Sequence, residues 1–299
     1  MIPEVKVLEE LTWVAPFGVR FWDVTAMTPA GAGLSVIAYP NAIPELRSAA
    51  GVNHTGVYFF HGLPGLRKFE SGDGLEDFWA ANPPSIPFTV EVSDPQDRYL
   101  PYQFSVLLPA HGLYGLMGSP LLPSFTPDGT WLPLFSSPSR ALPGPSGIVR
   151  AQLLDDTTGL PAAWALVTGQ LAGSLTVPAL ADDRGVVTLT IPYPEPTTSP
   201  FASPLGPGSL KLSDQTWPLT LMIFYSPQIS SPVSSAGTDE FVLPDLETIL
   251  RQKRANAWRD TAHSAPATGF TLQFGKDLVL RSSDSGTGRD LPVLLITPA

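Results

Sequence analysis

The sequence contains no cysteine and few charged side chains, and these absences exclude several classes of protein. Without a cysteine among its 299 residues, the chain has no disulfide, no thiolate nucleophile and no cysteine-ligated metal. Charged residues make up 15% of the chain, with 17 basic against 27 acidic side chains and a net charge of −10. Because cysteine is missing, we expect no redox chemistry. The acidic balance repels a phosphate backbone, so we expect no nucleic-acid binding.

Long apolar segments are missing as well. No run of about 18 apolar residues is present to span a bilayer. The first residues, MIPEVKVLEELTW, lack a cationic segment followed by an apolar stretch and a cleavage site, which a secretory signal requires. We therefore expect synthesis in the cytoplasm and no direct membrane span.

The usual catalytic and metal-binding motifs do not occur. The sequence has no Gly-x-Ser-x-Gly elbow, no His-Glu-x-x-His, no phosphate loop and no Gly-x-Gly-x-x-Gly. The histidines are scattered: His54, His61, His111 and His263. For His61 we expect a structural role. The carboxylate pairs at 155–156 and 182–183 would suit Ca²⁺ if their loops met, but turn formation explains both pairs. We expect no enzyme, no metal and no cofactor.

Proline and glycine are abundant, with 34 and 26 residues, and they separate short apolar runs. Such runs at 19–24, 34–39, 55–60 and 88–92 are typical of β-strands. Within the first run, Phe21 and Trp22 must point to opposite faces of a strand. One of them then belongs to the core, and the other is a rim or contact residue.

The stretch 146–193 has the clearest β pattern. Apolar runs at 148–154, 163–167 and 185–191 are separated by Asp/Gly clusters that favour turns. In the last run Val187, Leu189 and Ile191 alternate with threonines, as in a strand with one buried face. We place Trp164 in the middle run and expect the core of this sandwich to depend on it.

The order of residues in this stretch resembles the carboxypeptidase regulatory-like, or transthyretin-like, β-sandwich family. The resemblance is carried by Gly147, Asp155, Gly159, Pro161, Ala165, Asp183, Gly185 and Leu189. It implies a β-sandwich without catalytic zinc residues. Because such sandwiches are accessory modules in many settings, the resemblance says little about function.

We predict an all-β protein of two transthyretin- or Ig-like sandwiches with proline-rich connectors and one short helix. The first sandwich spans 1–118 and the second spans 146–299, with a proline-rich insertion after residue 192. Between them, 119–145 is a proline-rich connector. Proline density there removes backbone donors and prevents a central strand.

A helix is predicted over 245–259, where apolar residues recur at roughly helical spacing and Asp245 stands near the start. This helix would carry Arg251, Lys253 and Arg254, either as a docking face or as a solvated face. Aromatic residues in or beside prolyl segments are candidate interface anchors. They are Trp131, Phe135, Phe201 and Trp217.

The combination of 56–69, 88–109 and the regulatory-like core resembles accessory proteins of phage-tail-like contractile injection systems. The resemblance implies a non-enzymatic structural subunit at the periphery of a baseplate or cap. It would be present in multiple copies with other protein subunits of a symmetric particle. The alternative is a surface or secreted β-sandwich module that binds carbohydrate or another ligand. Exposed aromatic residues in loops would favour that alternative, whereas the missing leader counts against it.

Overall fold

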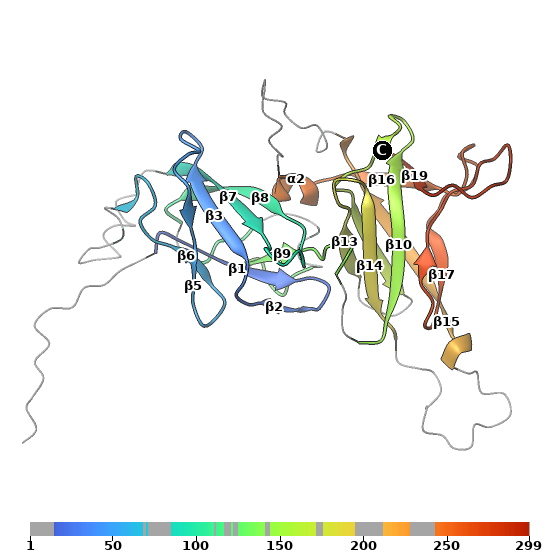
Figure 1. Cartoon of the computed structure of the whole chain (residues 1–299), viewed down its shortest axis with the longest axis horizontal. Helices are drawn as coiled ribbons and strands as arrows, with labels where there is room; N and C mark the ends of the chain where they lie inside the picture. Colours follow the sequence, from blue (N-terminus) through green and yellow to red (C-terminus); the bar gives the residue numbers. More distant parts are fainter. Residues whose placement is uncertain are drawn as a thin grey trace, which may run out of the picture.

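The computed structural model describes residues 15–67, 70, 85–110, 112–116, 121, 125–140, 144–171, 176–194, 212–227 and 243–298. This part of the chain is almost entirely β-structure, arranged as two units side by side along the long axis (Figure 1). Its one α-helix is α2 (Leu246–Leu250), and η3 (Leu212–Asp214) is a 3-10 turn. None of the described helices is long and apolar enough to cross a membrane. The all-β prediction with a short helix is confirmed.

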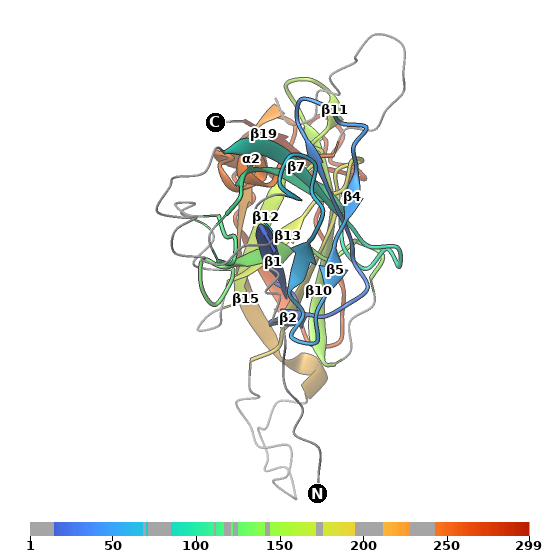
Figure 2. The same ribbon diagram turned by 90° about the vertical axis from the view of Figure 1, so that its left-hand side faces the viewer.

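The first unit has two sheets. The five-stranded sheet has the order β2-β1-β6-β5, with β9 paired to β1. The four-stranded sheet has the order β4-β3-β7-β8. The strands are β1 (Phe17–Asp23), β2 (Thr28–Ala30), β3 (Ser35–Pro40), β4 (Ser48–Ala49), β5 (Gly51–Val52), β6 (Tyr58–Phe60), β7 (Ile86–Ser93), β8 (Tyr102–Leu108) and β9 (Trp131–Leu134). Figure 2 looks at this unit end-on, with the second unit behind it.

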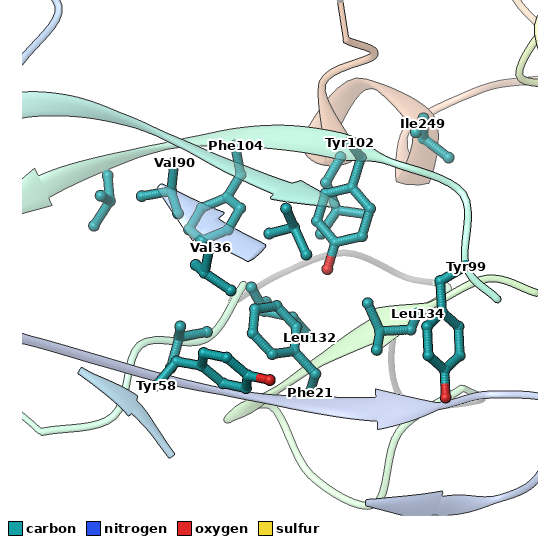
Figure 3. Close-up of a cluster of buried hydrophobic side chains, with 14 of the residues drawn as sticks. Phe21, Val36, Tyr58, Val90, Tyr99, Tyr102, Phe104, Leu132, Leu134 and Ile249 are labelled. Atoms are coloured by element: carbon teal, nitrogen blue, oxygen red, sulfur yellow. The ribbon is translucent and has the colours of Figure 1, made fainter. Parts of the chain in front are cut away.

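Aromatic side chains fill the space between these two sheets. Buried positions alternate with more accessible ones along β1 and β8, so every second side chain faces inward. The inward rings include Phe17, Phe21, Tyr58, Phe60, Phe88, Tyr102 and Phe104. Figure 3 shows the ring of Tyr102 entering this core from β8, with Ile249 of α2 above it.

The second unit is built around β10, which pairs with β11, β14, β18 and β19. The strands are β10 (Ser146–Asp155), β11 (Leu160–Pro161), β12 (Leu166–Leu171), β13 (Val177–Leu180), β14 (Val186–Pro192), β15 (Thr216–Phe224), β16 (Arg254–Trp258), β17 (Gly269–Gln273), β18 (Leu278–Val279) and β19 (Leu294–Thr297). The alternation predicted in β14 is confirmed, because Val187, Leu189 and Ile191 are buried. The last strand, β19, closes the sheet between β10 and β16.

The two units share a packed boundary. The backbone N–H of Gln103 in β8 donates to Pro244 O at 2.9 Å, just before α2. The apolar residues of α2, Leu246, Ile249 and Leu250, belong to the core of the first unit. The short helix therefore belongs to the second half of the sequence but packs on the first unit.

Trp164 also lies at this boundary and not in a strand. It adopts a turn conformation with φ of 60° before β12 begins at Leu166. Its side chain is buried and packs in the same core as α2, and its carbonyl accepts a hydrogen bond from Gln252 Nε2 at 2.8 Å. The prediction of a strand at this position was wrong, because contacts with the other unit, absent from any local pattern, fix the turn.

The connector 119–145 contributes the strand β9, which lies at the edge of the described sheet and is compatible with the expectation that its prolines prevent a central strand. β9 pairs in parallel with β1, placing Trp131 opposite Arg20 and Pro133 opposite Trp22. Among the described strands β9 pairs with β1 alone, and an edge strand tolerates a proline because one of its two sides needs no N–H donor.

The predicted helix over 245–259 is shorter than expected. The helix ends at Leu250, and Arg254–Trp258 form β16, which pairs with β15 and β19. Ala255 and Ala257 are buried on the inner face of that strand. Their spacing of two suits a strand, and pairing with two neighbouring strands decides between the alternatives.

Candidate interaction surface

The outward face of the five-stranded sheet carries a cluster of two tryptophans and an arginine. Phe21 points inward with no exposed surface, whereas Arg20 and Trp22 point outward from β1. The expectation that Phe21 and Trp22 occupy opposite faces is confirmed. The parallel register with β9 brings Trp131 next to Arg20 on the outer side. We call Arg20, Trp22 and Trp131 the outer aromatic face.

The three side chains of the outer aromatic face contact one another directly. The guanidinium carbon of Arg20 lies 4.0 Å from the ring centroid of Trp131, in a cation–π arrangement. The Trp22 and Trp131 rings meet edge to face, with centroids 5.5 Å apart and an interplanar angle of 66°. All three residues remain partly accessible. Each of the three side chains therefore restricts the rotamers of its neighbours.

Asp128 and Thr130 hold the guanidinium of Arg20 in place. Arg20 Nη2 lies 3.2 Å from Asp128 Oδ2, and Arg20 Nε donates to Thr130 Oγ1 at 3.1 Å. The Thr130 hydroxyl and backbone N–H donate to Asp128 and, with Arg20, hold the pKa of that carboxyl below its ordinary value. Asp128 therefore stays ionised to lower pH, and Arg20 keeps its partner.

Only part of the predicted set of aromatic anchors reaches the surface. Phe135 has no exposed surface and packs in the core of the first unit, so its prediction as an interface residue was wrong. Its position after β9 turns the side chain inward. Trp217 is partly buried in a cluster with Tyr193 and Phe274, whose centroids lie 5.2 and 6.4 Å from its own. Phe201 lies outside the described residues.

The predicted basic residues are exposed but do not share a helix face. Arg251 caps the end of α2 and pairs with Glu247 at 2.5 Å. Lys253 lies in the short link to β16, and Arg254 is the first residue of that strand. The prediction of a helical docking face is therefore wrong, because the chain changes from helix to strand between these positions.

The predicted turn functions of the acidic clusters are confirmed. Asp155 Oδ1 accepts the backbone N–H of Thr157 at 3.0 Å, and Asp182 Oδ1 accepts that of Val186 at 2.8 Å. Within the described ranges, no three His, Asp or Glu side chains gather to hold a metal ion.

Two histidine–carboxylate pairs were not predicted. His61 Nδ1 lies 4.0 Å from the buried Glu70. His263 Nε2 lies 2.8 Å from Asp156 Oδ2, and its ring stacks on Trp258 with centroids 4.7 Å apart. His263 and Asp156 are separated by 107 positions, so no local spacing in the sequence indicates this pair. It connects the turn after β10 to the loop after β16.

Comparison with known proteins identifies no family for this chain. No family model matches the chain, and no curated protein matches it significantly. Two variants of the shaft pilin SpaA from Lactobacillus rhamnosus GG align over 95% and 99% of this chain and 98% and 93% of their own, at 9% and 10% identity and a TM-score of 0.23. A C-terminal fragment of the pilus adhesin SpaC from the same organism covers 94% of this chain and 96% of its own, at 12% identity and a TM-score of 0.18. At such scores the likeness carries no argument about this protein.

Proposed function

We propose that this protein is a non-catalytic structural subunit that joins other protein subunits of an assembly through its outer aromatic face. The carrying observation is the ordered contact of Arg20, Trp22 and Trp131 on the accessible side of a sheet. Tryptophan and arginine are the residue types most enriched among energetically dominant interface positions. Because Asp128 and Thr130 already fix Arg20, a partner orders few additional rotamers when it binds.

The setting we propose is the periphery of a baseplate or cap in a phage-tail-like contractile injection system. Support for this setting comes from the sequence resemblance alone. In such a particle the protein would be made in the cytoplasm and incorporated in several copies. Two sandwiches that share a packed boundary suit this role, because contacts across the boundary restrict the direction of an interaction face.

The geometry of Trp131 favours a protein partner over the alternative of a carbohydrate. A sugar ring stacks on a bare aromatic face. In this structure the guanidinium of Arg20 lies over the Trp131 ring, and Trp22 meets it edge to face. Arginine and aromatic edges together present mixed polar and apolar contacts, which are typical of protein interfaces.

The test is incorporation of the tagged full-length chain into particles isolated from the cells that produce it, followed by native mass spectrometry and electron microscopy. The unaltered chain should be recovered in a symmetric particle of defined copy number. The double variant Trp22→Ser/Trp131→Ser should remain monomeric, since truncating such residues costs about 2 kcal/mol or more, over tenfold in affinity.

The matched control is Trp258→Ser, which removes a partly exposed tryptophan of the second unit. It should assemble normally, and circular dichroism should show that both proteins are folded. A folded double variant that still assembles would refute the outer aromatic face as the interface. An unaltered chain that stays monomeric and binds glycans would instead support the ligand-binding module.

A further inference from the structure

A polar hollow of about 260 Å³ lies between the end of the connector and the outward side of β10 and β14. Its polar lining comes from both units: Ser139, Arg140, Ser146, Arg150, Thr188 and Thr190. No carboxylate is among the described residues that line it, although the chain has a net charge of −10. Two guanidinium groups and four hydroxyls around a small space form an environment suited to an anion.

Arg140 is the fixed member of this lining. Its side chain is only 15% exposed, and its Nη2 lies 2.7 Å from Asp23 Oδ2. Its Nη1 donates to Ser136 Oγ at 2.9 Å, and its guanidinium lies over the ring of Tyr99 at 4.6 Å. These contacts hold Arg140 at the base of the connector with little rotational freedom.

Arg150 is the more open member, with a side chain 47% exposed. Its Nε lies 3.3 Å from Asp277 Oδ2, and its Nη1 reaches Thr188 Oγ1 at 3.5 Å. Its Nη2 has no hydrogen-bond partner within the described part of the chain. A guanidinium has five N–H donors in a planar fork, so donors of Arg150 remain for a ligand.

We propose that this hollow binds a small oxyanion, such as a phosphate group, whether free or carried on a small alcohol. Arginine guanidinium groups bind tetrahedral oxyanions through charge-assisted and often bidentate hydrogen bonds, and the hydroxyl of Thr190 supplies a further donor. The volume holds one such group and leaves room for a small carrier.

The bound anion also joins the two units. Thr188 Oγ1 already donates to Pro138 O at 3.1 Å, which ties the connector to β14. An anion held by Arg140 from the connector and Arg150 from β10 adds a second tie at the same place. Binding to the folded state alone raises the apparent stability of the protein by mass action.

The experiment is calorimetric titration of the full chain with inorganic phosphate, glycerol phosphate and glycerol, at an ionic strength kept constant with chloride. We expect heat of binding and a raised Tm with inorganic phosphate, and none with glycerol. Binding of glycerol phosphate at least as tightly as phosphate identifies a carried group as the ligand, whereas weaker binding identifies the free anion.

Two variants test the location. Arg150→Gln should weaken phosphate binding by about tenfold or more, because it removes charged donors. Thr190→Tyr should abolish binding by filling the hollow while leaving the charges in place. The control Arg184→Gln alters another exposed arginine, paired with Asp182 at 3.2 Å, and should bind as the unaltered chain does. Absence of phosphate binding, equal binding of glycerol, or unchanged binding in both site variants would overturn the proposal.

Discussion

The first unit fills its core with large aromatic rings, whereas the second unit fills its core with small aliphatic side chains. In the first, Phe17 lies 5.5 Å from Phe60 and 6.5 Å from Phe104, centroid to centroid. In the second, the described residues of the buried core are valine, alanine, leucine and isoleucine, with Tyr225 as the one aromatic ring among those described. The same β-architecture is thus stabilised by a few large contacts in one unit and by many small ones in the other.

The difference determines which changes each unit tolerates. Small side chains let strands and side chains approach closely in the second unit, where a Cβ at Gly169 would lie 2.3 Å from Leu189 Cδ2. Large rings in the first unit bring polar groups with them, so hydroxyls such as that of Tyr102 are buried in its core. We therefore expect the second unit to be sensitive to added volume and the first to lost rings and to tyrosine ionisation.

The largest loss of stability is expected from a substitution at the boundary between the two units. Trp164 follows β10 and β11 in the chain but packs in the aromatic core. Trp164→Ala should lower the free energy of unfolding by about 3–5 kcal/mol. Hydrogen exchange followed by mass spectrometry should show loss of protection in both units.

The control for Trp164 is Trp258→Ala, which truncates a partly exposed ring in the second unit. Its loss should be smaller and restricted to that unit. If Trp164→Ala left the first unit's protection unchanged, the two cores would be energetically separate.

Alkaline pH should unfold the first unit before the second. Burial, assisted by Glu91, raises the pKa of Tyr39 to about 12. Burial likewise raises the pKa of Tyr99, next to Asp23, and of Tyr114, near Glu247, to about 12. Because these folded-state values exceed the ordinary value of 10.0, the neutral forms contribute stability that is complete below pH 10 and is lost as the pH rises toward 12.

Tyrosinate absorbance and hydrogen exchange measured across this pH range test the order of unfolding. Protection in β1, β7 and β8 should fall first. Simultaneous loss in β10 and β14 would contradict the comparison.

Added volume should destabilise the second unit by an intermediate amount. Gly169→Ala places a methyl group against Leu189 and Ile191, and overpacking of this kind costs about 1–3 kcal/mol. Gly269→Ala is the matched control, because no atom lies within 4 Å of its added Cβ, and it should stay within about 0.5 kcal/mol of the parent. Urea unfolding measures both. Equal stabilities for the two variants would show that the second core can expand.

Two tyrosines of the first unit should respond with opposite signs to loss of the hydroxyl, and the smallest effect of all is expected at Tyr102. The Tyr102 hydroxyl is buried without a partner among the described residues, so Tyr102→Phe should stabilise by about 1 kcal/mol. Tyr99 OH donates to Asp23 Oδ2 at 2.8 Å, so Tyr99→Phe should destabilise by about 1.5–3 kcal/mol. Thermal unfolding compares them, and destabilisation by Tyr102→Phe would indicate a partner for its hydroxyl.

Short-range sequence patterns were sufficient to predict a strand and two turns of the second unit. The alternation in β14 and the Asp/Gly turns at 155–159 and 182–185 depend on neighbours within a few residues, and both expectations are confirmed. The opposite directions of Phe21 and Trp22 follow from strand geometry in the same way. The predicted bounds of the two sandwiches, 1–118 and 146–299, remain predictions. The connector between them contains β9.

The interaction surface could be predicted only in part. Trp131 was expected from its prolyl surroundings, and strand alternation predicted that either Phe21 or Trp22 faces outward without deciding which. The role of Arg20 was missed, because its contact with Thr130 spans 110 positions and depends on the parallel register of β1 with β9. Phe135 was misplaced because proximity to proline does not tell which side of a strand end faces the core.

The sequence by itself determined the all-β class, the buried face of each strongly alternating strand and the sites of its turns, because backbone geometry and nearest neighbours control these features. Tertiary structure alone decided that Pro133 lies in a strand, that Arg254–Trp258 leave the helix, and that Trp164 packs across the boundary. In each case the deciding free energy comes from strands or side chains distant in sequence, and a local pattern compatible with two conformations does not contain it.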